Sequence, residues 1–476
     1  MVKKMNDDSR KVRQEETIAA ISTPSGESAI GLVRLSGATV ITIVGQMFRA
    51  PSGKRLITFD SHKVYYGFVV DQNGEKIDET MITLMLSPRT YTREDVAEIS
   101  GHGGATAVKA ILKRTLELGA RLAEPGEFSK RAFLNGRIDL VQAEAIIDLI
   151  KSKSSKGFKT AFSQLDGQLS IALGEIEEGL IDVISDIEAS IDFPEEELDI
   201  LDNSALAEKL QKLQYKTSKL LDTYGVGRIY REGVGVAIVG RPNVGKSSLM
   251  NCLLERDRVI VTEKPGTTRD TVEETLQIEG VAVRIIDTAG VREALDEAER
   301  MGAKRAVQAA READIVLLIL DGAERLSMDD INLIDELRSK EEPGGPAIIP
   351  VVNKSDKVLR LETSDVEKRT SHVVSRISAK KNDGIDDLRK RISAKIDKLG
   401  ENLYDGPVLT RERHMEKLNE MSQSIGRAME TAKEGMSREF VAVDLQDAKE
   451  ALGELTGKEI DEMALEKIFS EFCIGK

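Results

Sequence analysis

The chain has 476 residues, too many for one hydrophobic core, and this length favours about three compact units. Apolar residues make up 40% and charged residues 32%, which is typical of globular domains and excludes a disordered or fibrous chain. The formal net charge of −14 excludes a broad basic surface for nonspecific nucleic-acid binding, although it is compatible with a local basic patch.

The predicted elements change character along the chain. Between about residues 17 and 130, short β-like runs and turn signals such as Asn73-Gly74 predict a small α+β domain. From about 136 to 225, apolar residues at helical spacing predict long amphipathic helices. Between about 230 and 395, apolar strands alternate with helical stretches, which predicts a parallel sheet with helices on both faces. The predicted strands are Ile30–Leu35, Val64–Val70, Met81–Leu86, Val234–Val239, Val281–Ile286, Ile315–Leu320, Ala347–Val352 and Val373–Ile377.

Helical spacing resumes after Gly400, so we expect the α/β unit to be inserted into a helical domain. The stretch from Ala172 to Glu208 is acidic and contains no Lys or Arg, and it should face solvent or a basic partner. The N-terminus lacks the apolar core of a signal peptide, and the strongest apolar run lies between Asp314 and Asp321. These features predict a cytoplasmic protein without a transmembrane helix.

A phosphate-binding loop follows the predicted strand Val234–Val239. Residues 240 to 247 read G-x-x-x-x-G-K-S and precede a helical run, which is the context that this motif requires. Its glycines let backbone N–H groups close around phosphates, Lys246 is expected to reach the β and γ oxygens, and Ser247 is expected to ligate Mg²⁺. The predicted phosphate-contacting residues are Asn243, Val244, Gly245, Lys246, Ser247 and Ser248.

Further motifs follow in the order of a guanine-nucleotide-binding fold. Thr268, in a Gly-Thr-Thr-Arg-Asp run, suits a switch loop that completes the Mg²⁺ shell. The run Asp287, Thr288, Ala289 and Gly290 ends a strand and is expected beside the metal and the γ-phosphate. In Asn353, Lys354, Ser355 and Asp356, the last carboxylate can accept two hydrogen bonds from the N–H edge of guanine, which adenine does not offer, so the motif predicts GTP. Ser378, Ala379 and Lys380 are expected to close over the base.

The catalytic group is not evident from these motifs. The residue after Gly290 is Val291, where Ras-like enzymes carry a water-orienting Gln, so another group must position the water. Nearby acids are Glu293, Asp296, Glu297 and Glu299. Asn243 is either an ordinary turn residue after Pro242 or a ligand for a monovalent cation that replaces an arginine finger. The motifs alone do not choose between these alternatives.

The flanking segments resemble a known family along nearly the whole chain. The chain is similar to the MnmE (TrmE) family of tRNA-modifying GTPases in its N-terminal and C-terminal signatures as well as in its GTPase motifs. The matching segments are Thr17-Ile18-Ala19-Ala20, Gly31 to Gly37, Tyr91-Thr92-Arg93-Glu94-Asp95, Gly101-His102-Gly103-Gly104, Pro125 to Gly136 and Cys473-Ile474-Gly475-Lys476. A ribosome-assembly GTPase is the alternative, but residues 401 to 476 do not resemble a basic RNA-binding module.

The resemblance implies a multidomain α/β plus α+β protein. It implies an N-terminal α+β folate-binding and dimerisation domain at residues 1–134, a helical domain at 135–229 and 396–476, and an inserted Ras-like P-loop G domain at 230–395. It also implies a homodimer that forms a heterotetramer with an FAD-dependent partner of the MnmG (GidA) type. Together these would add an aminomethyl or carboxymethylaminomethyl group to the wobble uridine of certain tRNAs, with 5-formyltetrahydrofolate or a related tetrahydrofolate as carbon source and K⁺-dependent GTP hydrolysis.

The resemblance also implies roles for individual residues. Asn243, Thr262, Lys264 and Thr267 become K⁺ ligands, Ser247 and Thr268 become Mg²⁺ ligands, and Glu299 becomes the acid that positions water. The implied folate site consists of Arg34, Glu98, Arg137 and Lys476. The family often has Lys where this chain has Arg137, which keeps the charge but changes the geometry.

The two cysteines have different expected roles. Cys252 and Cys473 are too few for a disulfide framework and form no paired metal-ligand spacing, so the compartment is expected to be reducing. Cys252, in the helix after the phosphate loop, is expected to pack in the core. Cys473 is either a buried small hydrophobe or a thiol near the folate or tRNA base, and we favour the position near the site.

Overall fold

The computed structural model describes residues 16–51, 60–192, 203–257, 274–286, 308–339, 345–399 and 406–476. The described residues fall into two compact units, one within Met1–Ile147 and Leu452–Lys476 and the other within Asp148–Ala451. The two boundaries lie inside helix α5 (Leu140–Lys151) and helix α17 (Arg438–Thr456). Each unit is described separately below.

The first unit is built on a seven-stranded sheet with the order β3-β4-β5-β6-β2-β1-β7. The strands are β1 (Ile18–Ile21), β2 (Ile30–Ser36), β3 (Phe48–Arg49), β4 (Lys63–Val70), β5 (Lys76–Met85), β6 (Val96–His102) and β7 (Arg121–Leu122). All neighbours pair antiparallel except β1 and β7. The helices are α2 (Val40–Met47), α3 (Ala105–Glu117), α4 (Glu127–Leu134) and α18 (Glu462–Ser470).

Alternation along the central strands builds the core of this unit. Val33 and Leu35 of β2 and Ile82 and Leu84 of β5 are fully buried, and each pair is two residues apart, so both side chains of a pair lie on the same face. Helix α3 packs its buried Ile111 into the same cluster. This arrangement confirms the predicted α+β class for the N-terminal region.

The last residues of the chain belong to the first unit. Ser22 Oγ, just after β1, donates to the main-chain oxygen of Gly475 at 3.1 Å, and the Gly126 amide donates to the oxygen of Cys473 at 3.4 Å. Gly475 has a φ of 93°, and a Cβ there would lie 2.5 Å from the oxygen of Ile21. These contacts place the last residues of the chain beside the end of strand β1.

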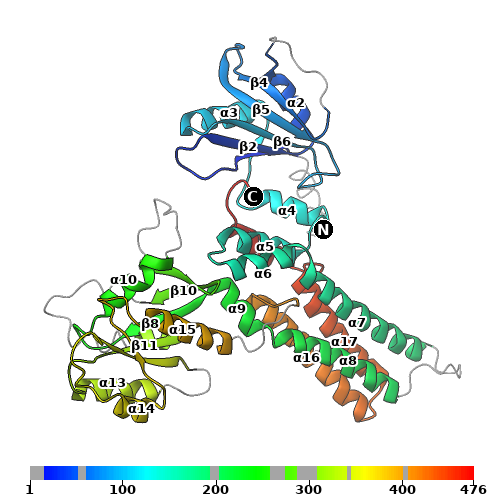
Figure 1. The fold of residues 1–476 in the computed structure, drawn as a ribbon. Coiled ribbons are helices and arrows are strands. Elements are labelled where there is room, and N and C mark those ends of the chain that lie inside the picture. Colours follow the sequence, from blue (N-terminus) through cyan, green and yellow to red (C-terminus); the bar gives the residue numbers. More distant parts are fainter. Residues whose placement is uncertain are drawn as a thin grey trace. The chain divides into compact units, whose positions relative to one another are not determined.

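The second unit contains a six-stranded sheet with the order β13-β12-β11-β8-β10-β9, of which Figure 1 labels β8, β10 and β11. The strands are β8 (Val234–Val239), β9 (Glu274–Ile278), β10 (Val281–Ile286), β11 (Ile315–Asp321), β12 (Ala347–Asn353) and β13 (Ser375–Arg376). The associated helices are α10 (Lys246–Asp257), α13 (Met328–Arg338), α14 (Thr363–Thr370) and α15 (Ile385–Leu399).

Both faces of this sheet are buried, as predicted. Along β11, Ile315, Leu317 and Ile319 enter one apolar cluster, and the alternate residues Val316, Leu318 and Leu320 enter the other. The five predicted strands β8, β10, β11, β12 and β13 pair in parallel, as predicted, and the unpredicted strand β9 adds an antiparallel edge beside β10. The short chain reversal at Glu279-Gly280 joins the two strands as a hairpin, which permits only antiparallel pairing.

The remaining helices of the second unit come from both sides of the sheet in sequence. They are α6 (Ser155–Leu165), α7 (Gln168–Asp192), α8 (Asn203–Leu221), α9 (Tyr224–Glu232) and α16 (Glu412–Lys433). Helix α8 precedes the sheet and packs beside α16, which follows it (Figure 1). This pairing confirms the insertion of the α/β unit into a helical domain. On α7 the acidic side chains of Glu175, Glu178, Asp182 and Glu188 are exposed, as expected for the acidic stretch.

Candidate nucleotide-binding site

The phosphate loop connects the carboxyl end of β8 to the amino end of α10. Gly245 has a φ of 101°, and a Cβ there would lie only 2.2 Å from Nδ2 of Asn353. Helix α10 begins at the next residue, Lys246, so its first N–H groups face the loop. Ser247 and Ser248 are exposed in this first turn. The loop therefore has the local geometry that binds phosphate oxygens.

Lys246 is held within the loop by main-chain oxygens. Its Nζ donates hydrogen bonds to the oxygens of Gly240 and Arg241, both at 2.8 Å. Burial lowers the pKa of the Lys246 ammonium group. A charge held in this partly desolvated position favours an anionic ligand, since a phosphate would offset the cost of burial.

The segment at the end of β12 is tied to the phosphate loop. Asn353, only 3% exposed, donates from Nδ2 to the oxygen of Val244 at 2.9 Å and accepts at Oδ1 from the Ala379 amide at 3.0 Å. Lys354 donates to the oxygen of Asn243 at 2.8 Å and pairs with Asp321 at 2.5 Å. The buried side-chain amide of Asn353 thus links the phosphate loop to the segment 378–380, which is expected to close over the guanine base.

Asp356 is exposed beside this junction. Ser378 Oγ donates to its Oδ1 at 2.6 Å, and this hydrogen bond lowers the pKa of the Asp356 carboxyl group. The Lys380 and Lys381 charges also lower it, to a smaller extent. Asp356 is therefore ionised at neutral pH, as an acceptor for two guanine N–H groups must be.

The structure thus brings together the predicted residues 243 to 248, 353 to 356 and 378 to 380. The other residues predicted for the nucleotide site lie outside the described ranges, namely Thr262, Lys264, Thr267, Thr268, Asp287, Thr288, Ala289, Gly290 and Glu299. In the part of the chain that is described, no group of three or more His, Cys, Asp or Glu side chains could hold a metal ion. Asp321 was not predicted as a site residue, although its position as the last residue of a buried strand is a usable signal.

Cys252 lies beside this site. It packs against the apolar core, as predicted, and its Sγ contacts the oxygen of Ala379 at 2.8 Å. Cys473, in contrast, is exposed, so it is not a buried hydrophobe. Its thiol lies close enough to Lys476 to affect the pKa of that ammonium group.

A second cluster of polar residues surrounds Tyr91 in the first unit. Arg34 on β2 and Glu98 on β6 face each other in the strand register, and Arg34 donates to Oε1 of Glu98 at 3.0 and 2.6 Å. The guanidinium groups of Arg34 and Arg137 lie 5.6 and 4.8 Å from the centre of the Tyr91 ring. Burial lowers the pKa of the Lys476 ammonium group, and the Arg34 charge lowers it further. The four residues implied by the resemblance thus lie in one cluster.

A buried ion network supports the Tyr91 loop. Arg131, 3% exposed, contacts Glu94 at 3.1 Å and Glu127 at 3.0 Å, and Ser129 hydrogen-bonds the Tyr91 hydroxyl at 2.7 Å. Burial tends to raise the pKa of Glu127, but hydrogen bonds from Arg121, the Glu124 amide and Arg131 lower it overall. The role of Tyr91 was not predicted, although the residue stands in one of the matching segments.

The phosphate loop, the carboxylate at Asp356 and the junction at Asn353 define a P-loop GTPase. Comparison with known proteins gives the family. The model for the N-terminus of GTP-binding protein TrmE matches residues 17–137, and the model for the MnmE helical domain matches residues 140–473. The chain belongs to the MnmE family of tRNA modification GTPases, as the resemblance indicated.

Individual relatives match over nearly their full length. The tRNA modification GTPase MnmE of Bacillus licheniformis is 41% identical over 97% of this chain and 100% of its own. The MnmE of Syntrophotalea carbinolica is 44% identical over 97% of this chain and 99% of its own. A solved structure of Aquifex aeolicus Era covers 40% of the chain and 66% of its own at 28% identity, with a TM-score of 0.27. In the described ranges, every helix is too short or too polar to cross a membrane.

Proposed function

We propose that this chain is the GTP-hydrolysing subunit of a system that modifies the wobble uridine of certain tRNAs. In this proposal an FAD-dependent partner and the chain together add an aminomethyl or carboxymethylaminomethyl group at C5 of the uridine, using a tetrahydrofolate one-carbon donor. The observation that carries it is the presence on one chain of the phosphate loop and of the cluster around Tyr91. Membership of a family whose members are named tRNA modification GTPases supports the choice of tRNA.

In the nucleotide site, the chain's own residues bind and orient GTP. Lys246 and the first amides of α10 would hold the phosphates, and Asp356, oriented by Ser378, would accept from guanine. Ser247 and Thr268 would hold Mg²⁺, which neutralises charge on the phosphate oxygens. The exposed position of Ser247 in the first turn of α10 fits this role.

Hydrolysis needs a group that replaces the missing Gln. Val291 cannot orient water, so we assign this task to Glu299 and assign charge compensation to K⁺ at Asn243, with Thr262, Lys264 and Thr267 as further ligands. Asn243 has a φ of 62° and an exposed side chain, and its main-chain oxygen accepts from Lys354. The Asn243 side chain is therefore open to solvent, as a ligand for a cation must be.

The cluster around Tyr91 fits a folate by its charge and shape. Arg34 pairs with Glu98, and Arg137 and Lys476 add two further cations to the cluster, so an anionic ligand would offset the excess positive charge. Glu98 binds Arg34 through Oε1, and no other described side chain donates to Oε2. That oxygen can accept from a pterin N–H, while the flat guanidinium groups and the Tyr91 ring suit a planar heterocycle.

Two measurements on the full-length chain test this assignment. GTP turnover should be faster in KCl than in NaCl at equal ionic strength, and equal rates would remove the K⁺ mechanism. Titration with 5-formyltetrahydrofolate should show binding that Lys476→Ala weakens and that Lys467→Ala, an exposed lysine on α18, leaves unchanged. Absence of binding to the unmodified chain would overturn the folate assignment.

A further inference from the structure

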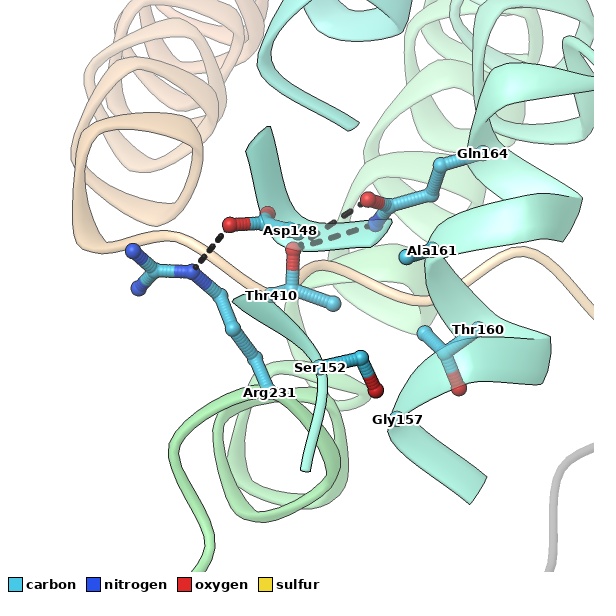
Figure 2. Close-up of a pocket in the computed structure, with 8 residues that line it drawn as sticks. All are labelled: Asp148, Ser152, Gly157, Thr160, Ala161, Gln164, Arg231 and Thr410. Atoms are coloured by element: carbon cyan, nitrogen blue, oxygen red, sulfur yellow. Dashed lines mark hydrogen bonds and ion pairs between the residues drawn. The ribbon is translucent and has the colours of Figure 1, made fainter. Parts of the chain in front are cut away.

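Helix α6 has two faces of opposite character. Gly157, Thr160, Ala161 and Gln164 line a small pocket together with Arg231 and Thr410, as Figure 2 shows. Gln164, 3% exposed, donates to the oxygen of Val408 at 2.8 Å and to Oγ1 of Thr410 at 3.2 Å. These hydrogen bonds hold this face of α6 against the segment that contains Val408 and Thr410.

The other face presents two aromatic rings to solvent. Phe158 and Phe162 are 51% and 54% exposed, their ring centres are 6.5 Å apart, and their planes differ by only 13°. They are four residues apart, so they lie one turn from each other on the same side of the helix. Aromatic residues make up only 4% of the chain, and burial normally stabilises a Phe side chain, so this exposed stacked pair is a candidate surface for a planar ligand.

The same region is basic in an acidic protein. Residues 149 to 165 contain Lys151, Lys153, Lys156 and Lys159 and no acid, while the whole chain has a formal charge of −14. Lys151, Lys153 and Lys159 are exposed, and none of them forms an ion pair with another described residue. Lys156 is half-buried and lies 5.6 Å from the centre of the Tyr230 ring. The exposed lysines therefore remain available to an anionic partner.

We infer that the region formed by Phe158, Phe162 and the exposed Lys159 on α6, together with the exposed Lys151 and Lys153 just before this helix, binds RNA. Unpaired bases stack on the two nearly parallel rings, and the ammonium groups contact the flanking phosphates. Charge complementarity favours a polyanion, and the paired rings favour one that carries exposed planar bases. The inference rests on the proposed function, because tRNA supplies both unpaired bases and phosphates.

Binding of labelled tRNA to the full-length chain, followed by fluorescence anisotropy, tests the inference. The double variant Phe158→Ala/Phe162→Ala should weaken binding about tenfold or more, since each stacked base adds appreciable affinity. Phe158→Leu/Phe162→Leu should bind equally weakly, whereas Phe158→Tyr/Phe162→Tyr should bind like the unmodified chain. Lys153→Gln/Lys159→Gln should reduce the slope of log affinity against log salt by about 0.7 per lysine.

Matched controls separate this surface from general effects. Phe440→Ala removes a Phe that is 62% exposed on α17, and Lys368→Gln/Lys390→Gln removes two exposed lysines of the G domain. Both controls should leave tRNA affinity unchanged, and basal GTP hydrolysis should be unchanged in every variant. Unchanged affinity in the Phe158→Ala/Phe162→Ala variant would overturn the inference.

Two further outcomes would also overturn the inference. Unchanged tRNA affinity in Phe158→Leu/Phe162→Leu would indicate that the two side chains make apolar contacts and do not stack on bases. Loss of self-association or of binding to anionic vesicles, with tRNA affinity retained, would assign the face to a second copy or to a membrane. Failure of the unmodified chain itself to bind tRNA would instead contradict the proposed function, and this result is distinct from a failure of the α6 variants.

Discussion

Replacement of Asn353 by Ala tests the junction between the two halves of the nucleotide site. The change removes two hydrogen bonds, of 2.9 and 3.0 Å, and leaves the Val244 oxygen and the Ala379 amide without their partner. Each unsatisfied buried group costs about 1–3 kcal/mol, so the total for the two groups is about 2–6 kcal/mol. Because both loops must be ordered to hold the nucleotide, we expect GDP affinity to fall about 30-fold or more.

The assay is equilibrium binding of a fluorescent GDP analogue to the full-length chain. Asn332→Ala, at an exposed position on α13, is the matched control and should bind like the unmodified chain. Gly245→Ala disturbs the same junction from the other side, since its Cβ would lie 2.2 Å from Nδ2 of Asn353, and it should also weaken binding. A change below twofold for Asn353→Ala, with both hydrogen-bonding groups still buried, would refute the reasoning.

Glu299→Ala should lower the turnover number by about 10²-fold or more while leaving GTP affinity nearly unchanged, and loss of affinity in a binding titration would place Glu299 in a structural role. Ser378→Ala should raise the pKa of Asp356 toward its ordinary value and weaken GDP binding as pH falls, and an unchanged pH profile of affinity would contradict the orienting role of Ser378. The hydrogen bond that His102 Nδ1 donates to Asp78 Oδ1, and then the negative charge of Asp78, raise the pKa of His102. Protonated His102 therefore contributes stability that is complete below its ordinary pKa of about 6.5 and is lost as pH rises through the raised value. NMR titration should show the raised pKa of His102 in the unmodified chain and a pKa close to the ordinary value in Asp78→Asn. Equal pKa values in the two proteins would rule out the His102–Asp78 interaction.

Much of the α/β architecture was predictable because burial on both faces leaves a continuous apolar run. The strand expected at Val234–Val239 has those bounds as β8, and the one expected at Ile315–Leu320 extends by one residue. The strand expected at Val373–Ile377 is only Ser375–Arg376, because Val373 is 65% exposed and the Val374 amide donates to the side chain of Glu367. The positions of apolar residues alone do not show which backbone amides take part in the hydrogen bonds between neighbouring strands.

For the two candidate sites as well, the sequence predicts the residues that belong to short motifs but not the contacts between residues far apart in the chain. Motif spacing was enough to place Lys246, Asn353 and Asp356, because each stands at a strand end that the fold brings to one edge. It did not reveal that Gly475 approaches Arg34, with 3.4 Å between the Gly475 oxygen and Nη1, since 441 positions separate the two residues. Contacts of this kind depend on the folded chain, and only the resemblance had placed Lys476 beside β2.

Analysis of the wobble uridine tests the central claim most directly. Unmodified tRNA would be incubated with the full-length chain, the FAD-dependent partner, a tetrahydrofolate donor and K⁺, with either GTP or a non-hydrolysable analogue, and its nucleosides would be separated by mass. The account predicts a C5-modified wobble uridine with GTP and none with the analogue or without the chain. An unmodified uridine with GTP, or equal modification with the analogue, would contradict it.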